Sequence, residues 1–306
     1  MSWLWKGNDE VIFETAEQRK RKTKIRNIKN FSVAAFILLF VVGFIILRQY
    51  DFDLSSASGS NHEEEVTTEQ QETKPVTYAY GESNIMLYCV NDNGNDVLFL
   101  ALLRADMNEG FIKIHPISTA EKIFSYKDVT GNVTGNAVSC YKAGGASLLK
   151  EACENYLGAS IDRHIGINES DFENITMNFP EIQLYFDEAV SLSKSGDTVS
   201  FSMGNHKMTD DEILKFMSYD GRDESTKLSD QGYLIENIID QYFNDSFVEN
   251  SASIFSRIIN LLDTDVSIFD LTDNKRAFQY MANKHSDFEC ETITEKEEFI
   301  SFVTED

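Results

Sequence analysis

An uncharged apolar run near the N-terminus constrains this chain more than any other feature. Residues 31–47 read FSVAAFILLFVVGFIIL and contain no charge. A helix needs roughly 17 to 25 apolar residues to cross the hydrocarbon core of a bilayer, whereas the apolar core of a cleaved signal peptide has about 7 to 15. The run therefore predicts one transmembrane helix over residues 31–48 that is retained as a signal anchor. A cleaved signal peptide and a buried core helix are the alternatives.

Charges on the two sides of this run predict its orientation. Residues 1–30 carry eight basic and four acidic side chains, and only Arg48 is basic directly after the run. Basic residues are retained on the cytoplasmic side of a membrane. The sequence therefore predicts a cytoplasmic tail over residues 1–30 that contacts the lipid bilayer, and a C-terminal domain outside the cell membrane.

Residues 49–77 have the composition of a linker. They combine a Ser-rich stretch with runs of Glu, Thr and Gln, and they lack apolar periodicity, which is typical of disorder. The remaining residues, 78–306, are enough for one large domain. Because the chain has a formal net charge of −24, this domain is strongly acidic, which argues against nucleic acid as a partner.

Cysteine and histidine spacing indicates no metal cage built by the protein. The cysteines form no CxxC pair and the histidines form no HExxH pattern. Two interpretations of the cysteines stay open, a disulfide in an exported domain or small buried apolar side chains. The four are Cys89, Cys140, Cys153 and Cys290.

Periodicity in the domain predicts a mixture of strands and helices. The expected strands cover residues 84–90, 97–104, 111–115, 161–167, 182–186 and 198–202. The expected helices cover 146–157, 169–178, a segment beginning after Thr209, 232–243, 253–262 and 274–282. This order predicts a layered α/β or α+β domain, with a mixed β-sheet flanked by helices.

Four short motifs follow one another along the domain. They are residues 112–119 (IKIHPIST), 140–145 (CYKAGG), 208–219 (MTDDEILKFMSY) and 261–266 (LLDTDV). Their order and spacing resemble the LytR-CpsA-Psr family of cell-envelope proteins. In that family, the second motif is Ala-Tyr-x-x-Gly-Gly before a helix, and the first is a strand ending in Pro-Arg-Asp-Thr. The likeness extends over about residues 80 to 300 and implies a LytR-CpsA-Psr-like extracytoplasmic domain.

The resemblance also implies a role in cell-wall glycopolymer attachment and envelope assembly. Active members resemble phosphotransferases that move a glycopolymer from a polyprenyl pyrophosphate carrier to peptidoglycan, with Mg²⁺. A pyrophosphate leaving group gathers negative charge, so such a site needs arginine forks and a metal ion. The partners implied are a polyprenyl (pyro)phosphate lipid and a cell-wall glycopolymer or peptidoglycan.

Most of the family's motif arginines are absent from this chain. Gly94, Ile117, Ser218, Asp220 and Asp230 stand at arginine positions of the family motifs. Each aspartate there replaces attraction to a pyrophosphate with repulsion. We therefore expect a degenerate member, a pseudoenzyme that binds a lipid carrier, a wall polymer or a paralogue. The alternatives are an active Mg²⁺-dependent phosphotransferase with relocated cations, and a non-enzymatic interaction or sensor protein.

A few polar residues remain as site candidates, although no catalytic residue is predicted. Asp96 keeps a motif carboxylate and is the candidate Mg²⁺ ligand. Lys227, Gln231 and Thr119 are candidates for contact with a phosphate or substrate. Substitutes for the missing arginines would have to come from elsewhere in the chain, and the candidates are Arg104, Arg163 and Arg222.

Apolar helix residues are candidates for the wall of a polyprenyl tunnel, as the resemblance implies. The competing interpretation is an ordinary hydrophobic core. The residues in question are Leu148, Leu149, Ile213, Leu214, Ile235, Ile238 and Ile239.

Overall fold

The computed structural model describes residues 82–106, 109–129, 131–176, 182–268, 275–283 and 289–304. The tail, the helix over 31–48 and the linker over 49–77 lie outside these residues and stay predictions, as does a domain boundary at residue 78. Among the helices of the described ranges, none combines the length and apolar character needed to cross a bilayer.

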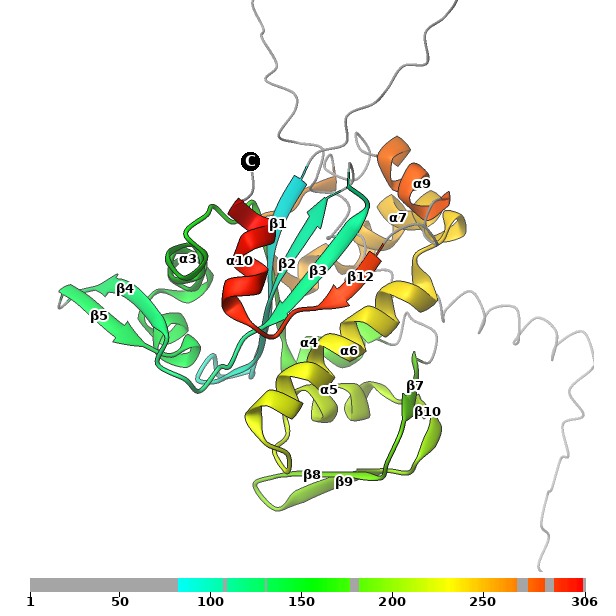
Figure 1. Cartoon of the computed structure of the whole chain (residues 1–306), viewed down its shortest axis with the longest axis horizontal. Helices are drawn as coiled ribbons and strands as arrows, with labels where there is room; N and C mark the ends of the chain where they lie inside the picture. The colour runs from blue at the N-terminus through cyan, green and yellow to red at the C-terminus, as the bar shows by residue number, and fades with distance from the viewer. Residues whose placement is uncertain are drawn as a thin grey trace, which may run out of the picture.

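A six-stranded mixed sheet forms the centre of the domain, with strand order β11-β6-β1-β2-β3-β12 (Figure 1). Neighbours β1, β2 and β3 are antiparallel, whereas β6 runs parallel to β1 and β12 runs parallel to β3. The strands are β1 (Glu82–Val90), β2 (Val97–Asp106), β3 (Phe111–Pro116), β6 (Arg163–Asn168), β11 (Leu262–Thr264) and β12 (Glu289–Thr292).

Both faces of this sheet are buried, because side chains of one strand alternate between two hydrophobic clusters. In β1, Leu87 and Cys89 face one cluster, while Met86 and Tyr88 face the other. The face of Met86 is covered by α3 (Ala137–Leu157) and α10 (Lys296–Thr304). The opposite face is covered by α4 (Glu169–Thr176), α5 (Asp210–Ser218), α6 (Glu224–Tyr242) and α7 (Asp245–Ile258). The predicted layered α/β architecture is confirmed.

Three two-stranded sheets and two further helical segments complete the described fold. The paired strands are β4 (Phe124–Asp128) with β5 (Gly131–Gly135), β7 (Ile182–Phe186) with β10 (Gly204–Met208), and β8 (Val190–Lys194) with β9 (Asp197–Phe201). The segments are the 3₁₀ helix η3 (Ile259–Leu261) and α9 (Lys275–Asn283), which packs against α7. The side-chain amide of Gln241 in α6 accepts a hydrogen bond from the backbone N–H of Gln183 and donates one to its C=O. These two bonds cover the outer edge of β7.

Several helix boundaries differ from the prediction. Helix α3 begins at Ala137, ahead of the predicted start at 146, and it breaks where Gly144 and Gly145 leave helical geometry. Helices α6 and α7 also begin before their predicted starts, at Glu224 and Asp245. The prediction missed the start of α6 because its first turns are mostly polar. Helix α9 is not the last element, since β12 and α10 follow it.

The predicted start of α5 is confirmed. The Thr209 side chain accepts a hydrogen bond from the N–H of Glu212, whose carboxylate accepts one from the N–H of Thr209 at 2.8 Å. We expect Thr209→Ala to lower the free energy of unfolding by about 1 kcal/mol, because a helix N–H loses its acceptor. Urea denaturation measures this loss, with Thr209→Ser as the control that retains the oxygen. Equal losses in both variants would mean that the cap is not the cause.

Candidate functional site

The motif residues gather at one edge of the central sheet, the motif edge, where β1 ends and β2 begins. At this edge Val90, the last residue of β1, pairs with Val97 of β2 and with Asn168 of β6. The Asn91 side chain closes the β1–β2 turn by accepting hydrogen bonds from the N–H groups of Asn95 and Asp96, at 2.8 and 3.1 Å. Asp96 therefore has a fixed position directly before β2.

A lysine from β8 reaches Asp96. Nζ of Lys194 lies 3.3 Å from Oδ2 of Asp96, and both side chains are partly exposed. Its neighbour Ser193 exchanges two backbone hydrogen bonds with Asp220, at 2.8 and 3.1 Å. The end of β8 thus joins the Asp96 turn to the segment after α5. Sequence reasoning missed Lys194 because the alternating polar residues of β8 were not predicted as a strand.

Lys227 lies in the same region, and its charge is already paired. Nζ of Lys227 is 3.0 Å from Oδ1 of Asp220, the residue that replaces a motif arginine. Asp220 is largely exposed, whereas the lysine side chain is mostly covered. Phosphate contact through Lys227 stays a prediction, and a phosphate there would compete with this carboxylate.

Arg222 has a structural environment. Its guanidinium donates to Asp230 and to the backbone oxygen of Phe216, and it lies 4.6 Å above the Phe216 ring. Burial lowers the pKa of Arg222, and the nearby Asp230 opposes this effect. Asp230, expected to repel a pyrophosphate, instead balances a buried cation.

The other two candidate arginines lie at the far end of the sheet. Arg104 contacts Glu82 at the start of β1. Arg104 is seven residues from Val97 along β2, which corresponds to about 23 Å at the rise of a strand. Arg163 pairs with Ile85 near the same end of β1. Neither residue substitutes for a missing arginine at the motif edge.

Gln231 lies in the interior, and Thr119 lies after the end of β3. The Gln231 side chain is buried, and its Nε2 donates to the backbone oxygen of Met217 at 2.6 Å, while its Oε1 has no hydrogen-bond partner. Thr119 lies beyond Pro116, the last residue of β3, and is partly exposed. Substrate contact by either residue stays a prediction.

Residues of the motif edge do not fit a metal held by protein side chains alone. Over the ranges that the structure describes, no three His, Cys, Asp or Glu side chains come together as a metal site. Asp96 already pairs with the Lys194 ammonium, which a Mg²⁺ ion would have to displace. Binding of Mg²⁺ to Asp96 therefore stays a prediction.

The CYKAGG motif connects α3 to the sheet. A side-chain carbon added at Gly94 would lie 3.8 Å from Cε1 of Tyr141, so the tyrosine ring covers the β1–β2 turn. The same ring lies 5.7 Å from the ring of Tyr88. Gly144 and Gly145 then allow the helix to break, and Gly145 has a positive φ of 64°. The motif therefore positions an aromatic side chain beside the site.

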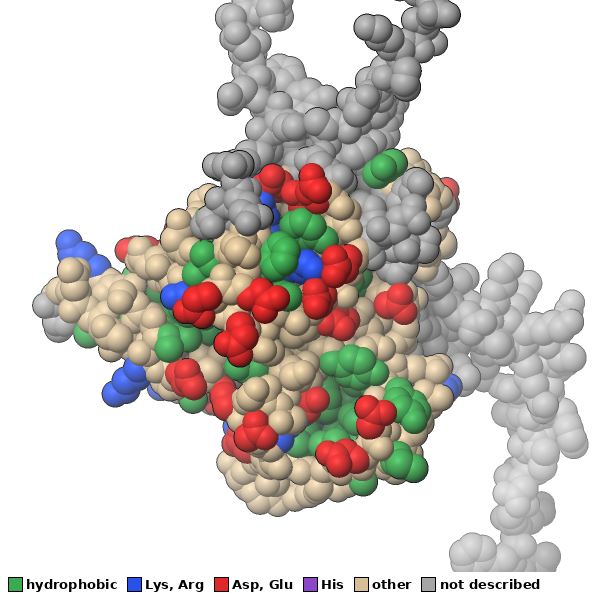
Figure 2. Space-filling model, in the orientation of Figure 1, with side chains coloured by type: hydrophobic (Ala, Val, Ile, Leu, Met, Phe, Trp, Pro, Cys, Tyr) green, Lys and Arg blue, Asp and Glu red, His purple; other side chains and the backbone are tan. Residues whose placement is uncertain are grey.

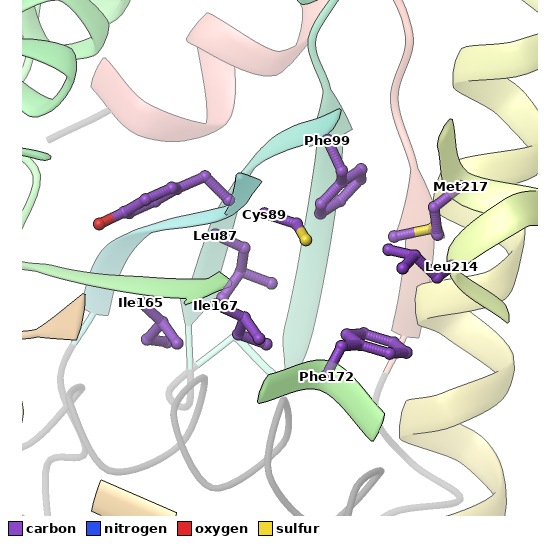
Figure 3. Close-up of a pocket in the computed structure, with 9 residues that line it drawn as sticks. Leu87, Cys89, Phe99, Ile165, Ile167, Phe172, Leu214 and Met217 are labelled. Carbon is purple, nitrogen blue, oxygen red and sulfur yellow. The ribbon is translucent and has the colours of Figure 1, made fainter. Parts of the chain in front are cut away.

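An apolar pocket lies between the sheet and helices α4 and α5, next to the motif edge (Figure 3). Its cavity volume is about 40 Å³, well below the range of about 300–1,000 Å³ of ligand pockets. Figure 3 shows Phe172, Leu214 and Met217 on the helices opposite Cys89 and Phe99 on the sheet. The lining residues are Leu87, Tyr88, Cys89, Phe99, Ile165, Ile167, Phe172, Leu214 and Met217.

Only one of the seven predicted tunnel residues lines this pocket. That residue is Leu214, while Leu148 and Leu149 pack on the opposite face of the sheet. The isoleucines at 213, 235, 238 and 239 are buried in the core on the pocket side. For these six residues, the core interpretation holds.

The cysteines are unpaired in the structure, and three of them are buried. Burial raises the pKa of the Cys89 thiol to about 12, so in the pocket it acts as a small uncharged side chain. This arrangement agrees with the interpretation of the cysteines as buried apolar residues.

Residues 125–303 match the LytR_cpsA_psr family, and the chain belongs to this family. A polyisoprenyl-teichoic acid–peptidoglycan teichoic acid transferase, TagU of Enterococcus faecalis, is 24% identical over 151 residues. That match covers 48% of this chain and 48% of TagU, so the chain spans about half the length of this relative.

Solved structures show the same fold. TagV of B. subtilis superposes with a TM-score of 0.58 at 17% identity, over 70% of this chain and 84% of TagV. A putative transcription regulator of Eubacterium siraeum has a TM-score of 0.60 at 13% identity, over 76% and 90% of the two chains. These similarities establish the architecture of the domain.

Proposed function

We propose that this chain is an extracytoplasmic family member that acts in cell-wall glycopolymer attachment and envelope assembly as a binding protein, with little or no transferase activity. The name of its relative TagU describes transfer of teichoic acid from a polyisoprenyl carrier to peptidoglycan. One observation carries the proposal. Near the motif edge, Lys194, Lys227 and Arg222 each pair with an aspartate.

Charge pairing weakens each cation as a ligand for pyrophosphate. A phosphate oxygen would have to displace Asp96, Asp220 or Asp230, and the displaced carboxylate would then repel it. Removing a single oxyanion donor commonly reduces kcat by about 10²–10³-fold. Several missing arginines together would reduce turnover at least that far.

Within this proposal, the apolar pocket contacts the lipid chain and widens to enclose part of it, because its volume of about 40 Å³ is too small as it stands. Its lining side chains are apolar, and it lies between the sheet, α4 and α5, while the Tyr88 ring points to the opposite face of the sheet. Such a pocket favours burial of hydrocarbon over binding of a polar ligand. The partners in this proposal are the lipid carrier, the wall polymer and the bilayer.

A membrane anchor over residues 31–48, with the N-terminus in the cytoplasm, is part of the same proposal. Its support is the charge asymmetry across the apolar run. This topology would place the pocket and the motif edge outside the membrane, where glycopolymers are attached to the wall.

A transfer assay tests the proposal directly. The full chain in membranes would be given Mg²⁺, peptidoglycan and a glycopolymer linked to polyprenyl pyrophosphate, beside the Enterococcus faecalis TagU in the same membranes. We expect turnover at least about a hundredfold below that of TagU, because most motif arginines are missing and Lys194, Lys227 and Arg222 are each paired with an aspartate.

Comparable turnover in the two proteins would overturn the binding-protein proposal. It would indicate an active phosphotransferase with relocated cations. The double variant Lys194→Gln/Lys227→Gln would then show whether these two lysines supply them.

A further inference from the structure

A second cavity, which we call the hairpin groove, lies between the β4–β5 hairpin and α3. Its cavity volume is about 510 Å³, within the range of about 300–1,000 Å³ of ligand sites, and it is open to solvent. The hairpin projects from the domain beside α3, which covers the face of the sheet opposite the apolar pocket (Figure 1). Six of the eight residues that line the groove are Ser, Thr, Asn, Lys or Glu. The groove is therefore large enough for a ligand and mainly polar.

The hairpin supplies four polar side chains to the groove. Ser125 of β4 is paired with Thr134 of β5, and Lys127 is paired with Asn132 in the same way. These four residues are exposed, whereas Tyr126, between the two pairs, is buried. Because side chains alternate along a strand, the four lie together on the outward face of the hairpin.

Helix α3 supplies the other wall. Glu151 and Asn155 are exposed and lie one turn apart on this helix. Nδ2 of Asn155 donates a hydrogen bond to the backbone oxygen of Ser125 at 3.1 Å, which holds β4 against α3. The two walls are therefore fixed to each other.

Polar side chains in the groove do not bond to one another. In the β8–β9 hairpin, by contrast, the paired hydroxyls of Ser191 and Ser200 lie 3.2 Å apart and bond each other. Within the described part of the chain, five side chains of the groove have no hydrogen-bond or ion-pair partner. They are Ser125, Lys127, Asn132, Thr134 and Glu151. Their donors and acceptors remain available to a ligand.

The chemistry of the groove favours a ligand that is polar and uncharged. Its hydroxyl and amide groups both donate and accept hydrogen bonds, which matches the hydroxyls of a sugar. The formal charges of Lys127 and Glu151 cancel, and a polyanion would be repelled by a chain with a net charge of −24. In Figure 2 the projecting hairpin, at the left, is mostly tan, whereas acidic side chains gather over the centre of the face.

We propose that the hairpin groove binds an uncharged oligosaccharide, held by hydrogen bonds from the outward face of the hairpin and from α3. The inference rests on the proposed function, which gives this chain a binding role toward a wall polymer. It adds a site and the chemical class of the segment bound there.

Isothermal titration of the full chain in lipid nanodiscs, with empty discs subtracted, tests the inference. Three uncharged tetrasaccharides that differ in linkage or substituent are the probes: chitotetraose, cellotetraose and maltotetraose. Tetragalacturonate is an anionic chain of the same length. We expect at least one uncharged probe to bind more tightly than tetragalacturonate, because Glu151 and the acidic domain disfavour an anion.

The double variant Ser125→Ala/Thr134→Ala removes one cross-strand pair of hydroxyls from the groove. It should weaken binding of the uncharged probe about tenfold, because each lost hydrogen bond corresponds to roughly a fivefold change in affinity. The matched control Ser191→Ala/Ser200→Ala removes such a pair from the β8–β9 hairpin and should leave binding unchanged. Glu151→Ala, on the other wall, should weaken binding about fivefold, and it decides the matter if urea denaturation shows that the double variant is unstable.

Other outcomes overturn the inference. Absence of binding by all three uncharged probes at about 10 mM, or an equal loss of affinity in the control, would exclude a sugar site in the groove. Equal or tighter binding of tetragalacturonate would exclude the uncharged class. None of these results changes the turnover measured beside TagU, so the proposed function fails or stands by that separate assay.

Discussion

Phe216→Ala is expected to lower the free energy of unfolding by about 3–5 kcal/mol, the usual range for loss of a buried phenylalanine ring. Phe216 of α5 is almost fully buried. Its ring centroid lies 5.6 Å from those of Phe186 and Phe201, so the three rings join α5 to the two small sheets below it. The variant also removes the surface on which the Arg222 guanidinium lies.

Urea denaturation measures this loss, and Tyr185→Ala provides a control. Tyr185 lies on the outward face of β7 and is 53% exposed, so its truncation is expected to change stability by no more than about 0.5 kcal/mol. A loss below about 1 kcal/mol in Phe216→Ala would mean that the aromatic cluster does not hold α5 on the small sheets.

The central strands were predictable because their signal is local. β1, β2 and β3 are buried on both faces, so their sequences are nearly continuous apolar runs. Residues that cap the ends of helices were equally informative. Gly158 ends α3 with a φ of 73°, and the Thr209–Glu212 pair starts α5. Each of these features depends on neighbouring residues alone.

The small polar strands were not predictable in the same way. β4, β5, β8 and β10 have about half of their side chains in solvent and few large apolar residues, so their strand signal is weak. They form because they pair with partners across short turns or, for β10, across many residues.

The candidate site could be predicted only in part for the same reason. Motif matching located Asp96, Lys227 and the lost arginines, but not the charge pairs that involve them. Lys194 and Asp96 are 98 residues apart in the sequence, and only the path of β8 brings them together. The apolar pocket likewise joins Phe172 of α4 to Leu214 of α5, which no sequence period connects.

A polar cluster on the α3 side of the sheet carries the strongest pH dependence that we expect. The Tyr88 hydroxyl donates to Asp263 at 2.7 Å, and the Tyr88 ring fits against β6 because Gly166 has no side chain. His164 lies 3.8 Å from Asp263 and 3.3 Å from Asp265, and Lys150 is 3.3 Å from Asp265. The cluster attaches the segment after α7 to the sheet.

Burial alone would lower the pKa of His164, but hydrogen bonds and attraction from Asp263 and Asp265 reverse this effect and raise it to about 9. In the unfolded chain the pKa of histidine is about 6.5, so the folded state holds the proton more tightly. The resulting stability is fully present below pH 6.5 and is lost as the pH rises through 9. Because Asp263 is half exposed, we expect about 2 kcal/mol rather than the full value of the shift.

Urea denaturation at pH 6 and pH 9.5 would measure this loss in the unsubstituted chain and in His164→Gln. The variant should be less stable at pH 6 but close to the unsubstituted chain at pH 9.5, because at the higher pH both proteins lack the imidazolium. His206→Gln, which removes a histidine paired with Glu212 on the other side of the sheet, should keep the pH dependence. If His164→Gln showed the same pH profile as the unsubstituted chain, the attachment of the segment after α7 would not depend on the charge of His164. The hydrogen bond from the Thr264 hydroxyl to the His164 backbone oxygen, and the one from the His164 backbone N–H to the Asp265 carboxylate, would then be sufficient.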